Sequence, residues 1–188
     1  MLTRRLGATD LQVSVLGFGG APLGNLYKAV SDKEARDTLA AALNSGLNFF
    51  DTAPHYGAGL SERRIGDAVR GAHAKNCVVS TKVGRLLYPD SNADVEALRH
   101  GFVTPMPFEQ RYDYSYDGIM RSWEDSLIRL GLAIVDVLLV HDIGIETHRE
   151  FHKDRWMEFT AGGGYRALEE LRAGGQVRAI GLGVNEIK

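Results

Sequence analysis

The stretch that decides the fold is LNFFDTAPHYGAGLSERRIGDAVRGAHAKNCVVSTK, residues 47–82. It opens with the apolar run LNFFD, which predicts a buried strand that ends at Asp51. Ser61 then precedes an apolar pattern of helical spacing, which predicts a helix capped by that serine. The closing CVVSTK predicts a second buried strand that ends at Lys82. Buried strands separated by helices are typical of parallel βα units, in which helices cover the sheet.

The same alternation continues on both sides of this stretch. Towards the amino end we expect a β-hairpin over residues 2–14, a buried strand over 15–20, and a helix that opens with the capping box of Ser31 and Glu34 and stops at Gly46. Towards the carboxyl end we expect an irregular stretch over 84–114, a helix over 119–130, a strand over 135–140, a second long loop, a helix over 165–171 and a strand over 177–184. An eight-unit barrel typically needs about 250 residues, so the chain holds a little over half of one.

On length alone, an open doubly wound sheet fits 188 residues better than a barrel does. The glycines do not support that fold. Residues 17–22 read GFGGAP, which has the first two glycines of G-x-G-x-x-G, but Pro22 stands in place of the third and no helix follows directly. The motif of an open dinucleotide-binding sheet is therefore not met.

Composition limits the classes of protein and partner. The chain has 22 Lys+Arg and 24 Asp+Glu, a net charge of −2, which favours neither nucleic acid nor an anionic membrane. Its 44% hydrophobic and 24% charged residues are ordinary for a globular protein, and we expect a single domain over residues 1–188. Cys77 is the lone cysteine, no segment approaches the ~20 apolar residues of a membrane span, and nothing resembles spaced zinc ligands. We therefore expect a cytoplasmic protein with no metal site.

Three of the predicted strands end at residues able to do chemistry, namely Asp51, Lys82 and His141. The carboxyl ends of parallel strands converge on one mouth, so we expect these side chains in a common pocket, with Tyr56 on the loop beside them. Taken singly, each is more often structural, as a turn former, a solvated cation or a satisfied histidine. In combination, however, their charges can support proton transfer by Tyr56.

A tyrosine phenol titrates near about 10, too high for ready proton exchange at neutral pH. A lysine cation beside the phenol favours the phenolate, and an aspartate paired with the lysine fixes it in place. A neutral histidine can direct a carbonyl oxygen toward the phenol. The four residues can therefore protonate an alkoxide as hydride arrives at carbon, or deprotonate an alcohol as hydride leaves.

Four motifs carry a family resemblance, and they occur in this order: NFFDTAPHYG at 48–57, SERRIG at 61–66, STKVG at 80–84 and DVLLVHD at 136–142. The opening segments RRLG and VSVLGFG belong to the same pattern. By these motifs the chain is similar to the aldo-keto reductases. The resemblance implies a TIM-type (β/α)₈ barrel, of which this chain holds about the first five βα units. It also implies NADP or NAD as cofactor, with Tyr56 as the acid/base and Asp51, Lys82 and His141 as its partners.

The same resemblance implies cofactor contacts at Gly20, Ala21, Asp51 and Asn185. Residues 140–144, VHDIG, and 181–186, GLGVNE, are similar to the bacterial branch of L-fucose (D-threo-aldose) dehydrogenases and pyridoxal dehydrogenases, which act on an aldose or a pyridoxal hemiacetal. Members carry three more βα units than are present here. We therefore expect a chain truncated after the fifth barrel strand, with open barrel edges through which it could self-associate.

Three functions fit these residues. The first is an NAD(P)-dependent oxidoreductase with a small-molecule aldose or aldehyde substrate. The second is an aldolase or lyase with a Schiff base at Lys82, which Asp51 opposes because it keeps the lysine charged. The third is a non-catalytic remnant that associates through its open sheet.

Two weaker signals lie in the long loops. His148 and His152 have the spacing of a helical metal pair, but no third ligand is marked, so we expect a solvated loop there. Residues 84–114 fit either a substrate lid or a surface insertion without function, and we favour the lid because the stretch leaves from the strand of Lys82.

Overall fold

The sheet consists of parallel strands that follow one another in chain order. The computed structural model describes residues 1–70 and 76–186. The order of its five-stranded sheet is β3-β4-β5-β8-β9, and each strand is parallel to its neighbours. The bounds are β3 Phe18–Gly19, β4 Phe49–Asp51, β5 Val78–Val83, β8 Val137–His141 and β9 Ala179–Gly183. A doubly wound sheet reverses its strand order at a switch point, whereas the wall of a barrel does not. The partial barrel predicted from the sequence is confirmed.

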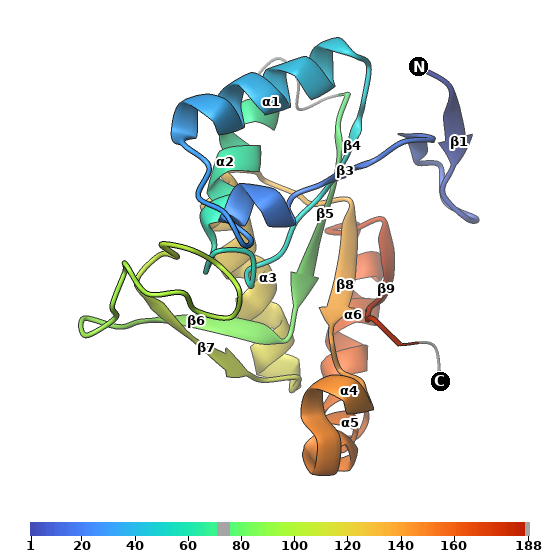
Figure 1. Cartoon of the computed structure of the whole chain (residues 1–188). Coiled ribbons are helices and arrows are strands. Elements are labelled where there is room, and N and C mark those ends of the chain that lie inside the picture. The colour runs from blue at the N-terminus through green and yellow to red at the C-terminus, as the bar shows by residue number, and fades with distance from the viewer. Residues whose placement is uncertain (71–75, 187–188) are drawn as a thin grey trace.

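Helices cover one face of this sheet, as Figure 1 shows for α1, α2 and α3. The covering helices are α1 Asp32–Asn44, α2 Leu60–Val69, α3 Tyr116–Leu130 and α6 Gly164–Ala173. Alternate strand residues point toward them, because successive side chains of a strand lie on opposite faces. The shared core includes Phe50, Val79, Val83, Leu138 and Val140 from the strands and Leu39, Ile65, Ile119 and Leu168 from the helices.

A second, smaller core lies on the other face of the strands, at their amino ends. The hairpin of β1 Thr3–Arg5 and β2 Gln12–Ser14 lies apart from the helices in Figure 1, at the N-terminus. Leu11 and Val13 from this hairpin pack with Val78 and Val137 from the sheet. The amino ends are therefore closed by apolar side chains, which leaves the carboxyl ends for polar chemistry.

Several local predictions hold and others are wrong. The capping box is present, since Ser31 accepts from the backbone N–H of Glu34 and the Glu34 side chain accepts from Ser31. Ser61 does not cap α2, because Gly59, at φ +94°, is the N-cap. The strand expected over 15–20 is shorter and not buried, since Val15 and Leu16 are 50% and 60% exposed.

The two stretches expected to be irregular both contain regular structure. Residues 84–114 include an antiparallel hairpin of β6 Arg85–Pro89 and β7 Phe108–Tyr112. The second long loop contains α4 Ile145–His148, a 3₁₀ turn Arg149–Phe151 and α5 His152–Thr160. Among the described residues, no helix has the length and apolar character needed to cross a membrane.

Candidate active site

The polar strand ends meet at the carboxyl edge of the sheet. Asp51 ends β4, Lys82 lies one residue before the end of β5, and His141 ends β8. The Lys82 ammonium donates to Asp51 Oδ2 at 2.7 Å and to the Thr52 carbonyl at 2.9 Å. Asp51 Oδ1 in turn accepts from Ser80 Oγ at 2.7 Å. The lysine is therefore held by two oxygens and its carboxylate partner is itself fixed.

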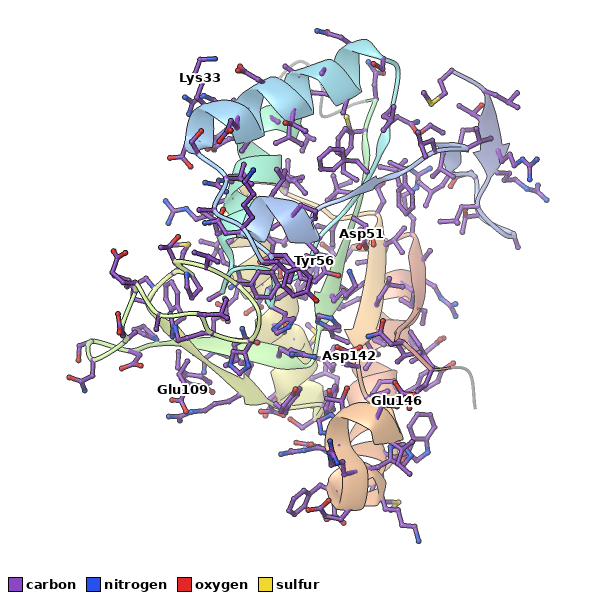
Figure 2. The ribbon with its side chains drawn as sticks, in the orientation of Figure 1. Lys33, Asp51, Tyr56, Glu109, Asp142 and Glu146 are labelled. Atoms are coloured by element: carbon purple, nitrogen blue, oxygen red, sulfur yellow. The ribbon has the colours of Figure 1, made fainter. Side chains whose placement is uncertain are left out.

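Tyr56 lies over this ion pair on the loop between β4 and α2, next to Asp51 in Figure 2. Lys82 Nζ lies 4.8 Å from the centroid of its ring. The ring of His141 stands perpendicular to that of Tyr56, with centroids 6.0 Å apart. The structure thus brings together the four residues that the sequence predicted.

A close backbone contact fixes the loop that carries Tyr56. A side chain at Gly24 would meet the Tyr56 and Gly57 backbone within 2.5–2.7 Å, and Gly57 itself adopts φ +66°. Only glycine fits both requirements without strain. The Tyr56 carbonyl also accepts from the backbone N–H of Ser61, which ties the loop to the first turn of α2.

His141 is held uncharged by its surroundings. Its side chain is buried, with 4% of the residue exposed. Burial, followed by the charges of Arg85, Lys82 and His55, lowers the pKa of His141 far below its usual range. A neutral imidazole can donate a single hydrogen bond to a reacting oxygen without carrying a positive charge.

Sequence reasoning missed a group of residues beside His141, which consists of His55, Arg85, Gln110 and Asp142. Arg85 lies in the stretch that was expected to be irregular, so its pairing with Asp142 could not be predicted. The signal present in the sequence was position, since Arg85 directly follows the motif STKVG, Asp142 ends the motif DVLLVHD, and His55 lies within NFFDTAPHYG.

The residues expected to contact the cofactor are placed differently from one another. Gly20 is buried, and its backbone N–H and carbonyl are both engaged, with the Asp51 carbonyl and the Ser61 hydroxyl respectively. Ala21 opens a short 3₁₀ helix, Ala21–Gly24, beside it. Asn185 is exposed and donates to Asp142 Oδ1 at 3.2 Å, which places it at the same sheet edge as His141.

The residues of the 85–112 hairpin pack against the Tyr56 loop. The ring of Phe102 lies 6.2 Å from that of Tyr56, and the backbone N–H of Met106 donates to the Gly57 carbonyl. This contact supports the interpretation of the stretch as a cover of the site, which stays a prediction.

His148 does not lie in a solvated loop, so that expectation is wrong. Its ring is buried at the end of α4, and its Nε2 lies 2.9 Å from the hydroxyl of Tyr114. His152 opens α5 instead of lying in a loop. Within residues 1–70 and 76–186, no three His, Cys, Asp or Glu side chains come together as metal ligands would.

The comparisons with known proteins agree with this geometry. The model of the Aldo/keto reductase family matches residues 15–188. Pyridoxal 4-dehydrogenase of Microbacterium luteolum is 46% identical over 97% of this chain and 55% of its own length. D-threo-aldose 1-dehydrogenase of a Pseudomonas species is 39% identical over 94% of this chain and 51% of its own length.

A solved structure gives the same picture for the fold. The holo form of aldo-keto reductase AKR11C1 from Bacillus halodurans superposes with a TM-score of 0.72 at 29% identity, over 98% of this chain and 51% of that one. The chain thus spans about half the length of the relatives that it matches.

Proposed function

Because the chain belongs to the aldo/keto reductase family, we propose that it carries the proton-transfer residues of a nicotinamide-dependent oxidoreductase. The substrate class proposed is an aldose or a pyridoxal-type carbonyl or hemiacetal, the chemistry named for two of its relatives. The observation that carries the proposal is the joint placement of Lys82, Asp51 and His141 around the Tyr56 ring.

In the proposed mechanism the Tyr56 hydroxyl exchanges a proton with the reacting oxygen. The Lys82 ammonium, 4.8 Å from the centroid of the phenol ring, stabilises the negative charge that Tyr56 carries when its proton has left. Asp51 keeps Lys82 in place through their 2.7 Å contact. The neutral His141 donates to the same oxygen and orients the substrate toward Tyr56.

A nicotinamide cofactor, when bound, supplies or accepts the hydride at the reacting carbon. The chain fits its reacting end, because the exposed Asn185 offers an amide donor and acceptor at the edge that holds the four residues. Gly20 fits a contact only as a shaped surface, since its polar groups are engaged within the protein. Ala21 lies beside it. The proposal therefore includes both NADP and NAD as cofactor.

The Schiff-base alternative is disfavoured by the contacts of Lys82. An amine that attacks a carbonyl must be uncharged, whereas Lys82 donates to a carboxylate and a carbonyl at 2.7 and 2.9 Å. Borohydride treatment with substrate, followed by intact-mass measurement, should show no adduct. A substrate-sized mass increase that disappears in Lys82→Ala would support an aldolase instead.

The experiment that tests the proposed function is Tyr56→Phe in the full-length protein. The phenol acts on the reacting oxygen alone, so we expect kcat to fall by more than about tenfold, equivalent to ~1.4 kcal/mol of barrier. Binding of NADPH or NADH, followed by fluorescence titration, should stay nearly unchanged. Retention of more than about a tenth of kcat would contradict the role of Tyr56 as acid/base.

Two remaining expectations stay predictions. β3 and β9 are the outer strands of the described sheet, and self-association through them is tested by sedimentation of this chain. A non-catalytic remnant would then associate without binding cofactor. The cytoplasmic location is tested by fractionation of the source cells.

A further inference from the structure

A buried ion pair lies directly beside His141. Its members are Arg85, the first residue of β6, and Asp142, which follows β8. We propose that Arg85 is a positioning residue which neutralises Asp142, so that the uncharged His141 keeps its Nε2 hydrogen available for the reacting oxygen. The inference rests on the proposed role of His141 and assigns a function to the β6–β7 hairpin.

Asp142 is placed to compete for the hydrogen on His141. Its Oδ2 lies 3.4 Å from His141 Nε2, while Nδ1 of the same ring has no hydrogen-bond partner within the described part of the chain. A carboxylate only accepts hydrogen bonds, so this contact favours the form with its hydrogen on Nε2. Asp142 also adopts φ +45°, a left-handed conformation in which aspartate is among the more frequent residues other than glycine.

Arg85 is fixed on several sides. It is 7% exposed, its Nη2 donates to Asp142 Oδ2 at 2.5 Å, and its guanidinium lies 5.0 Å above the Tyr112 ring. Its Nη1 lies 3.0 Å from Nδ1 of His55. Gln110 Oε1 lies 2.7 Å from the same nitrogen. Both strands of the hairpin therefore hold the arginine against the catalytic edge.

The charges around His141 explain why the arginine matters. The groups that face the imidazole are Lys82 from β5, Arg85 from β6, His55 and Tyr56 from the loop after β4, and Asp142. A carboxylate a few ångströms from a histidine favours the imidazolium and would take its Nε2 hydrogen into an ion pair. With the Arg85 cation on the same oxygen, that pull is offset and His141 stays neutral.

Asp142 also joins the two halves of the site. Its second oxygen accepts from Asn185 at 3.2 Å, and Asn185 is the residue proposed to contact the cofactor. Asp142 therefore contacts both His141 and Asn185, and its ion pair with Arg85 fixes the position of that carboxylate. The hairpin that supplies Arg85 acts on both through a single carboxylate.

The direct test is the titration of His141 by NMR in the full-length protein without cofactor, with its signal assigned by loss in His141→Gln. In Arg85→Gln the unpaired Asp142 should raise the pKa of His141 by about 1 to 3. Adding Asp142→Asn should reverse that rise, because it removes the carboxylate as well. Arg85→Lys keeps the charge and should leave His141 neutral. Arg111→Gln, an exposed arginine of the same hairpin, is the matched control and should change nothing.

The same variants are then followed by the pH profile of kcat. In Arg85→Gln any acid limb of kcat should move to higher pH, and the double variant should reverse that shift, whereas a purely structural role would lower kcat equally at every pH. A titration of His141 that does not move to higher pH in Arg85→Gln, relative to the unmodified protein, would overturn the proposal, whether or not the protein turns over. If no substrate is turned over while the titration shifts as expected, the proposed function fails and the role of Arg85 stands.

Folding of the variants is checked by thermal unfolding, and Arg85→Met replaces the Gln variant if the latter is unstable. The unmodified protein offers an independent outcome. Its ¹⁵N spectrum should show His141 neutral, with the hydrogen on Nε2. A hydrogen on Nδ1, or an imidazolium at neutral pH, would overturn the proposal.

Discussion

Two ion pairs lie on opposite faces of β5, one residue apart along the strand. On the helix side, Glu62 of α2 is fully buried, accepts from Thr81 Oγ1 at 2.7 Å, and pairs with Arg129 of α3 at 2.5 Å. On the other face, Lys82 pairs with Asp51, whose side chain is 31% exposed. Thr81 and Lys82 point to opposite sides because side chains alternate along a strand.

The difference shows that the two faces of β5 serve different purposes, since one face carries an ion pair that stabilises the fold and the other carries the pair proposed to take part in chemistry. The Glu62 pair is enclosed between two helices, so it has no access to a substrate and its partners are already satisfied. The Asp51 pair lies where the sheet ends, beside a tyrosine and a neutral histidine. Breaking a buried ion pair destabilises the fold because it leaves a buried charge without its partner. An ion pair at an open edge, in contrast, can act on a reacting group.

The largest effect should come from breaking the enclosed pair. Glu62→Gln leaves the Arg129 guanidinium, with a side chain 16% exposed, without its carboxylate. Removal of one partner of a buried pair costs about 3–5 kcal/mol of unfolding free energy, measured by urea denaturation. Glu109→Gln, which breaks an exposed pair, should change it by less than about 0.5 kcal/mol. Equal losses in the two variants would remove the distinction between enclosed and exposed pairs.

The second effect falls on the other face of β5. Lys82→Met in the full-length protein should lower kcat by about 100-fold, or ~2.7 kcal/mol of barrier, because the phenol loses its adjacent cation. Its unfolding free energy should fall less than that of Glu62→Gln, since Asp51 keeps its bond to Ser80 and contact with solvent. A variant that unfolds readily but turns over normally would reverse the assignment of the two pairs.

The third prediction uses pH, because buried histidines lie near the candidate active site and not at the enclosed pair. Burial is the first cause that lowers the pKa of His148 from 6.5 to about 4. Between those values the unfolded state binds a proton that the folded state does not. Stability should therefore fall as the pH drops through this window, by up to about 1.4 kcal/mol for each pH unit.

The matched variant for that window is His148→Gln, compared with the unmodified protein by urea denaturation at several pH values. Loss of the contact with Tyr114 shifts all points together, whereas loss of the titrating ring reduces the slope. An unchanged slope in His148→Gln would show that this histidine is not the group that titrates.

The smallest effect should appear at the exposed start of α1, far from either pair. Ser31→Ala removes the capping bond to the Glu34 backbone and should cost about 1 kcal/mol. Ser31→Thr preserves a hydroxyl and should recover most of it. Thermal unfolding measures both variants, and a change in kcat with Ser31→Ala would contradict the separation between the helix layer and the site.

Local patterns in the sequence were enough to predict the elements that carry the site. Asp51, Lys82 and His141 each follow an apolar run, and parallel strands place such positions at one edge whatever the rest of the chain does. The capping box of Ser31 and the stop at Gly131 are also local, since they depend on backbone groups within one turn of the helix.

Other features depended on contacts between distant residues. Ser61 fits the composition of a helix cap, yet it lies inside α2 and donates to the Gly20 carbonyl, because Gly59 already begins the helix with a backbone conformation that a serine would rarely adopt. The β6–β7 pairing joins segments about twenty residues apart, and nothing in either segment alone marks its partner.

The sequence by itself determined the order of the parallel strands and of the helices that cover them, the family resemblance and the positions of the four proposed proton-transfer residues, because these follow from short-range periodicity and motifs. Only the tertiary structure decided that Arg85 pairs with Asp142 and that His148 is buried against Tyr114. Both depend on which charges and rings meet after the chain has folded. Electrostatic effects on a side chain fall off over a few ångströms in space and are independent of distance along the sequence.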